Sequence, residues 1–185
     1  MPSIRPTVLL SAALLALSLL AAAAGPGGGR ATDAPPRLEQ DSVIRRIRAA
    51  YARTNAGLPR CERRRRELMD QSTEGGRLDA YVCRGEVVKL VAVLYGETGR
   101  ATEEFYLAGG RPYFVYRVSL RYERPFGKVA STGEDRFYFQ AGRLVRWLRG
   151  RRTVPPASPE AREEEREVLA RAAELLARAG GESSR

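Results

Sequence analysis

The order of apolar and polar positions divides the chain into four parts. An apolar run at residues 8–24 comes first, interrupted only by two serines. The next segment has apolar side chains every three to four residues, which is the spacing of an amphipathic helix. From residue 78 to 148 apolar side chains recur at alternate positions, which is the period of a strand. Helical spacing returns after residue 158. This order of helix, strands and helix predicts an α+β protein.

The leading apolar run is typical of a secretory signal peptide. Arg5 places a positive charge before it, and the alanines at residues 21–24 are the small residues at which such a peptide is cleaved. The run thins out from leucine to alanine, so it is marginal for crossing a hydrocarbon layer of about 30 Å. We expect residues 1–24 to be a cleaved signal peptide, with an uncleaved membrane anchor as the alternative. The mature protein would then be periplasmic or extracellular, with no stable membrane span.

The segment after the signal peptide leads into the first helix. Residues 25–40 are rich in glycine, proline and alanine, which predicts a flexible leader. Asp41 or Ser42 is expected to cap a helix that packs its apolar stripe on a core. The sequence at residues 55–59 contains Asn, Gly and Pro and is expected to end that helix.

The last helix has the clearest limits. Ser158 is the expected cap, the proline that follows suits the first turn, and Gly180 is expected to end the helix. The helix is expected to carry two favourable i,i+4 pairs, Glu167–Arg171 and Glu174–Arg178. Residues 181–185 would form a disordered tail. The folded part is therefore a single α+β domain at residues 41–180.

Six segments between the helices are expected to be strands. They are residues 78–83, 87–95, 101–107, 113–122, 136–140 and 143–149. The second is expected to be a central strand covered on both faces, or one with a single solvent-exposed position at Lys89. Residues 123–134 are expected to form a loop. Because short turns such as Ala141-Gly142 join the strands, we predict an antiparallel β-meander of five to six strands. The meander would be packed with an N-terminal and a C-terminal α-helix.

Export changes what the two cysteines indicate. In an oxidising compartment a disulfide between Cys61 and Cys83 is the expected state. A redox-active pair is the alternative, but such a pair normally has the C-x-x-C spacing, which is absent here.

The composition excludes several classes of enzyme. The chain has no histidine, which removes imidazole-based catalysis and histidine metal sites. We find no cofactor or nucleophile motif, so no metal and no cofactor are expected. The carboxylates that a hydrolase would use are Asp79, Glu86, Glu103, Glu104, Glu134 and Asp135. Glu103 and Glu104 are adjacent on a strand and point to opposite faces, so they cannot form a catalytic pair. We therefore expect a non-enzymatic protein.

The strongly basic composition indicates an anionic partner. The formal charge is +10, from 32 basic and 22 acidic residues. Arginine's planar guanidinium binds carboxylates and phosphates with two hydrogen bonds, although biased codon usage would also enrich arginine. The last helix is rich in glutamate and is expected to answer part of this charge. The candidate anion-binding surface consists of Arg63, Arg64, Arg65, Arg66, Arg143, Arg146, Arg149, Arg151 and Arg152.

Two aromatic strand pairs with glycine turns carry a resemblance. They are residues 104–107 and 112–116, and residues 136–139 and 142–146. In this region, residues 78–148, the chain resembles small exported bacterial α+β proteins of unknown function. It is also similar to MORN-like hairpin repeats, although no fixed period survives. The resemblance implies a fold and carries no catalytic residue.

These observations favour an exported, non-enzymatic binding or accessory module of the cell envelope. Its expected partner is an anionic envelope polymer or an acidic protein, and we expect a monomer. Export argues against nucleic acid as the partner. A secreted inhibitor that inserts residues 123–134 into a partner protein is the alternative, and a carboxylate-based hydrolase is a weaker one.

Overall fold

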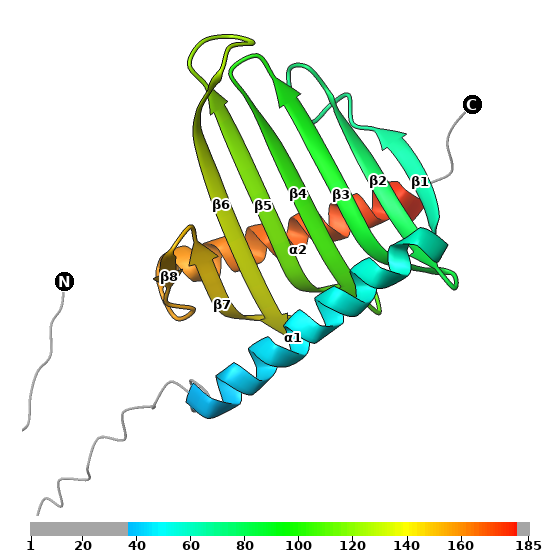
Figure 1. Cartoon of the computed structure of the whole chain (residues 1–185), viewed down its shortest axis with the longest axis vertical. Helices are drawn as coiled ribbons and strands as arrows, with labels where there is room; N and C mark the ends of the chain where they lie inside the picture. Colours follow the sequence, from blue (N-terminus) through cyan, green and yellow to red (C-terminus); the bar gives the residue numbers. More distant parts are fainter. Residues whose placement is uncertain (1–36, 181–185) are drawn as a thin grey trace, which may run out of the picture. The chain divides into compact units, whose positions relative to one another are not determined.

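The strands form one antiparallel sheet in the order in which they occur along the chain (Figure 1). The computed structural model describes residues 37–180. In this part the strands are β1 (Glu62–Glu67), β2 (Gly76–Cys83), β3 (Glu86–Gly96), β4 (Gly99–Ala108), β5 (Arg111–Tyr122), β6 (Val129–Gln140), β7 (Arg143–Arg149) and β8 (Arg152–Val154). The predicted α+β meander is confirmed, with eight strands in place of five or six.

The connections are short because each strand pairs with the next in sequence. At the β6–β7 turn both Ala141 and Gly142 have positive φ, 50° and 77°, as the predicted two-residue hairpin requires. Residues 129–134 belong to β6, so the long loop predicted at residues 123–134 is wrong, and only residues 123–128 connect β5 to β6. The inhibitory loop suggested by the sequence is therefore much shorter than expected.

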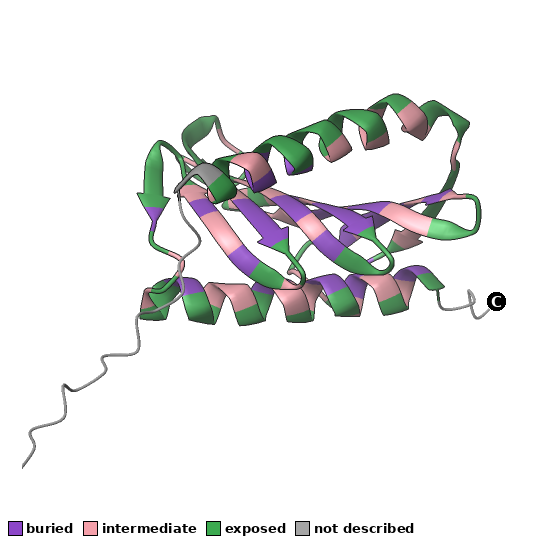
Figure 2. Ribbon diagram, turned by 90° about the horizontal axis from the view of Figure 1, so that it is seen from below, coloured by how far each residue is buried: buried purple, intermediate pink, exposed green. Residues whose placement is uncertain are grey.

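Helix α2 (Pro159–Gly180) covers one face of the sheet and closes the main core (Figure 2). Val168, Ala172 and Leu175 pack against Phe105, Phe137 and other side chains of that face. The predicted cap is confirmed, because the Ser158 hydroxyl accepts a hydrogen bond from the Ala161 N–H at 3.1 Å.

The charged pairs predicted along α2 are formed only in part. Glu174 and Arg178 pair at 3.1 Å as expected. The Glu167–Arg171 pair is wrong: Arg171 instead binds Glu103 of the sheet and Glu174.

Helix α1 (Arg37–Gly57) lies on the opposite face, where Figure 1 shows it crossing the sheet near one end of β3–β6. Val43, Ile44 and Ile47 pack there on the aromatic side chains of Tyr106, Phe114 and Tyr138. A short 3-10 helix, η1 (Leu58–Arg60), follows the stop signal that the sequence predicted. Within residues 37–180, no other α-helix lies on this face.

The first helix begins at Arg37, earlier than the sequence indicated. The Ser42 hydroxyl donates to the Glu39 carbonyl from inside the helix at 2.7 Å, so it does not cap it. The predicted signal peptide, the first part of the leader and the tail at 181–185 lie outside the described residues. Neither helix of residues 37–180 is long and apolar enough to cross a membrane.

Candidate functional site

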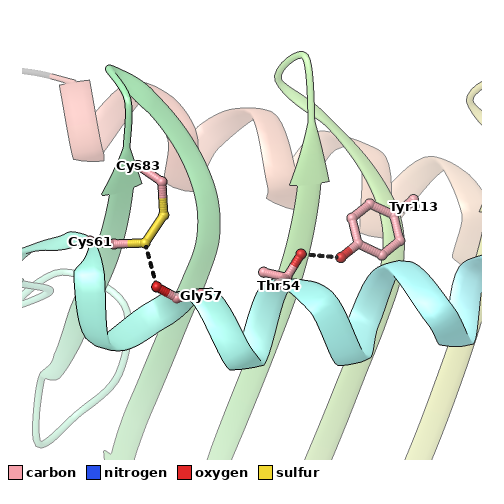
Figure 3. The surroundings of a disulfide bond; sticks show 5 residues. All are labelled: Thr54, Gly57, Cys61, Cys83 and Tyr113. Atoms are coloured by element: carbon pink, nitrogen blue, oxygen red, sulfur yellow. Dashed lines mark hydrogen bonds between the residues drawn. A yellow bond between two sulfur atoms is a disulfide. The ribbon is translucent and has the colours of Figure 1, made fainter.

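The predicted disulfide is confirmed: Cys61 and Cys83 are bonded, with their Cα atoms 4.6 Å apart (Figure 3). Cys61 follows η1 and Cys83 ends β2, so the bond ties the end of the α1–η1 segment to the β2–β3 turn. Nearby, the hydroxyls of Thr54 and Tyr113 share a hydrogen bond of 2.8 Å that ties α1 to β5. This corner of the domain is therefore held by a covalent link and a polar one.

The two arginine clusters singled out in the sequence lie at opposite edges of the sheet. Residues 63–66 form most of β1, which is one edge strand. Arg143, Arg146 and Arg149 lie on β7, and residues 151 and 152 lie in the turn to β8 and at its start, at the other edge. The structure therefore does not bring these clusters together into one surface.

The arginines of the β1 cluster are largely paired with a buried acid. Asp79 of β2, only 2% exposed, accepts hydrogen bonds from Arg63 at 2.7 Å, Arg65 at 2.9 Å and Arg77 at 3.0 Å. Arg64 binds Glu62 on its own strand. Burial alone would raise the pKa of the Asp79 carboxyl, but the hydrogen bonds and charges of Arg63 and Arg65 outweigh burial and hold this pKa below its ordinary value of 3.8.

This buried acid should give stability a pH dependence. We expect Asp79→Asn to lower the free energy of unfolding by about 2 kcal/mol at pH 7, less than for a fully buried pair, because the arginines are partly exposed. The folded pKa is depressed, so the carboxylate contributes fully above its ordinary pKa and loses this contribution as pH falls through the folded value. Urea unfolding of variant and parent should therefore differ less at about pH 2 than at pH 7. A difference that stays constant down to about pH 2 would contradict this role for Asp79.

The arginines of β7 and β8 form ion pairs mainly with glutamates of α2, as the glutamate-rich sequence of that helix indicated. Arg149 contacts Glu160 at 2.6 Å and Asp135 at 3.4 Å. Arg143 lies 3.4 Å from Glu165, and Arg152 lies 3.7 Å from Glu160. Most of the arginines chosen from the sequence thus already have a carboxylate partner within the domain.

A different set of arginines lies beside the disulfide. Arg53 of α1, Arg60 of η1 and Arg84 of the β2–β3 turn line an open groove of about 680 Å³, which also includes Glu86. We call this feature the basic groove. None of these three arginines forms an ion pair within residues 37–180. Arg84 and Gly85 have φ of 54° and 83°, the backbone of a tight two-residue turn, and the adjacent disulfide fixes this turn near Arg60.

The sequence does not predict the basic groove. Arg53 and Arg60 belong to the arginine-rich stretch at residues 42–66, Arg84 lies outside it, and no pattern indicates that the three come together. Only the disulfide, which the sequence did predict, could have indicated that Arg60 and Arg84 lie close together. Arg46 and Arg53 are exposed and seven residues apart on α1, about two turns, so the positive surface continues along the helix.

Lys89 is buried, which fits the predicted strand covered on both faces and contradicts the alternative of a solvent-exposed position. It is 8% exposed and donates to the Tyr106 hydroxyl at 2.8 Å, and its Nζ lies 2.9 Å from Glu104 Oε2. The Tyr106 hydroxyl donates to Glu104 at 2.8 Å and lies 3.2 Å from Asn55 Oδ1 of α1. Burial raises the pKa of Tyr106, and the Glu104 carboxylate raises it further. In this network Lys89, Glu104 and Tyr106 all have polar partners, and the contact with Asn55 holds α1 on β3 and β4.

A second hollow lies between α1 and the sheet, next to this network. It has a volume of about 360 Å³ and is lined by Ile47, Arg48, Tyr51, Phe114, Tyr116, Arg136 and Tyr138. We call it the aromatic cavity.

The candidate carboxylates do not converge on a cleft. Glu103 faces α2 and binds Arg171, whereas Glu104 faces α1 and binds Lys89, which confirms that they point to opposite faces. Glu134 contacts Arg136, and Asp135 accepts from the Trp147 indole N–H at 2.7 Å. Within residues 37–180, no group of three Cys, Asp or Glu side chains is placed to hold a metal ion.

No family model, no curated protein and no solved structure matches this chain. Function is therefore inferred from the geometry of the basic groove and the aromatic cavity.

Proposed function

We propose that this protein is an exported, non-enzymatic binding module of the cell envelope that holds an anionic polymer in its basic groove. The observation that carries the proposal is the gathering of Arg53, Arg60 and Arg84 around one open groove, each without a carboxylate partner in the described domain. By contrast, Arg65, Arg117 and Arg149 of the sheet are paired with acids of β2 and α2. A cluster left unpaired in such a domain favours an anionic partner from outside.

The shape and chemistry of the groove favour a polymer over a single ion. The groove is open to solvent, and the exposed arginines of α1 extend its charge over further turns of the helix. A chain with repeated carboxylates or phosphates can contact several guanidinium groups at once, each by two hydrogen bonds. The envelope setting is supported by the leading apolar run and by the disulfide, which is expected in an oxidising compartment.

Removing the three groove arginines should weaken polymer binding. At low salt we expect the variant Arg53→Gln/Arg60→Gln/Arg84→Gln to bind long-chain polyphosphate or poly-glutamate about tenfold more weakly than the parent. This loss of affinity follows because each exposed contact between charges contributes a few tenths to about 1 kcal/mol. Parent binding should itself weaken strongly as salt rises, because exposed charges are screened. Fluorescence anisotropy with each labelled polymer measures both effects, and the two polymers distinguish phosphate from carboxylate recognition.

A matched variant separates this site from general attraction by net charge. Arg121→Gln/Arg124→Gln/Arg162→Gln removes the same number of charges from exposed positions outside the groove. It should change affinity less than about threefold. Equal losses in both variants, an affinity independent of salt, or no binding at low salt would contradict the proposed function.

A further inference from the structure

The aromatic cavity has the size and walls of a small-molecule site. Its volume of about 360 Å³ lies within the usual range for ligand pockets, about 300–1,000 Å³. The rings of Tyr51 and Phe114 meet edge to face with centroids 5.3 Å apart, and those of Phe114 and Tyr138 lie 5.0 Å apart. Together with Tyr116 they surround the space with aromatic surface. A planar ring would pack well against such walls.

The three tyrosine hydroxyls of the cavity lining have no hydrogen-bond partner within the described residues. Tyr106 and Tyr113, just outside it, both use their hydroxyls in hydrogen bonds of 2.8 Å. By contrast, the hydroxyls of Tyr51, Tyr116 and Tyr138 make no hydrogen bond within residues 37–180. Tyr138 as a whole is only 4% exposed and lines the cavity. A hydroxyl at the cavity that has no partner within the described residues is available to a ligand.

The charges at the cavity favour an anion. Two guanidinium groups line it, Arg48 of α1 and Arg136 of β6, and no lining residue is acidic. Arg48 is exposed and forms no ion pair in the described domain. Arg136 contacts Glu134 and lies over the Tyr116 ring at 6.0 Å. The Tyr116 hydroxyl can donate because a tyrosine is ordinarily protonated at neutral pH. Burial and the nearby Glu134 raise its pKa further.

We propose that the aromatic cavity binds a small aromatic carboxylate. The ring would lie among Phe114, Tyr116 and Tyr138, and the carboxylate would accept from Arg48 and from the Tyr138 hydroxyl. This site shares no residue with the basic groove, so small-anion binding and polymer binding can succeed or fail separately.

The probe for this site is 3-phenylpropionate, compared with the neutral 3-phenylpropan-1-ol. Titration of the protein followed by NMR should give a dissociation constant of about 1 mM or lower for the acid, which is reasonable for a ligand of this size. The alcohol has a similar ring and chain but no charge, and it should bind about tenfold more weakly.

Two variants and a control locate the binding. Arg48→Gln should weaken 3-phenylpropionate binding about fivefold to tenfold, less than the usual loss for a hydrogen bond to a charged group because Arg48 is exposed. Tyr138→Phe keeps the ring and removes the free hydroxyl, and should weaken it about threefold to tenfold. Arg162→Gln, an exposed arginine of α2, should leave affinity unchanged. No saturable binding up to about 10 mM, equal affinity for the alcohol, or an equal loss in the Arg162 variant would overturn the proposal.

Discussion

Replacing Glu103 by glutamine is expected to lower the free energy of unfolding by about 3 kcal/mol. Glu103 is 7% exposed, and its two carboxylate oxygens contact Arg117 Nε at 3.2 Å and Arg171 Nε at 3.0 Å. Glutamine keeps the shape of the side chain but removes the charge, which leaves two poorly hydrated guanidinium groups with less compensation. Breaking a buried pair from one side costs more than the pair itself contributes.

The effect should be large because Glu103 is the centre of a chain of alternating charges between the sheet and α2. Arg117 also binds Glu164 at 2.6 Å, and Arg171 also binds Glu174 at 2.9 Å. These outer carboxylates stay in the variant and limit the loss.

Urea unfolding at pH 7 measures the effect, and an exposed pair on α2 provides the control. Glu163→Gln breaks the ion pair with Arg166, in which both side chains are more than half exposed, and should change stability by less than about 0.5 kcal/mol. A Glu103 variant as stable as the Glu163 variant would show that solvent screens the cluster under α2 as it does a surface pair.

The sequence predicts well those elements whose signals are local. The cap at Ser158, the positive-φ turn at Ala141-Gly142 and the end of the first helix all depend on neighbouring residues, and the structure has each of them. The disulfide also follows from local reasoning, because the chain has only two cysteines. The fold class follows from the order of these elements.

The first strand could not be predicted because it has no apolar side of its own. All six residues of β1 are charged, so the alternation that marks a strand is hidden. Arg63 and Arg65 nevertheless turn to the same side, where Asp79 of the neighbouring strand receives both. A buried acid therefore takes the place that a hydrophobic core normally has in fixing the register of a strand.

The pairing of Lys89 and Arg117 could not be predicted for a related reason. Each is a charged residue on a predicted strand, yet Lys89 meets Glu104 and Tyr106, and Arg117 meets Glu103 and Glu164. The partners come from β4 and α2, and only the tertiary fold places these elements beside the two strands. The basic groove and the aromatic cavity depend in the same way on where α1 crosses the sheet.

Removing the disulfide is expected to lower the free energy of unfolding by about 3 kcal/mol in the double variant Cys61→Ser/Cys83→Ser. The bond joins residues separated by 22 positions, and closing a loop of this length restricts the unfolded chain by about that amount. Urea unfolding of the parent with and without dithiothreitol, and of the double variant under the same two conditions, measures the effect. The reductant should destabilise the parent to about the level of the variant and leave the variant unchanged.

The same experiment tests whether the disulfide shapes the basic groove. Arg60 precedes Cys61 and Arg84 follows Cys83, so the bond sets the distance between these two arginines. At a urea-free condition where the double variant is still folded, its affinity for polyphosphate should fall about threefold or more, because the β2–β3 turn is no longer tied to η1. If stability falls and affinity does not, the disulfide supports the fold alone and the groove is held by the packing of α1. If neither falls, Cys61 and Cys83 contribute nothing measurable as a covalent link.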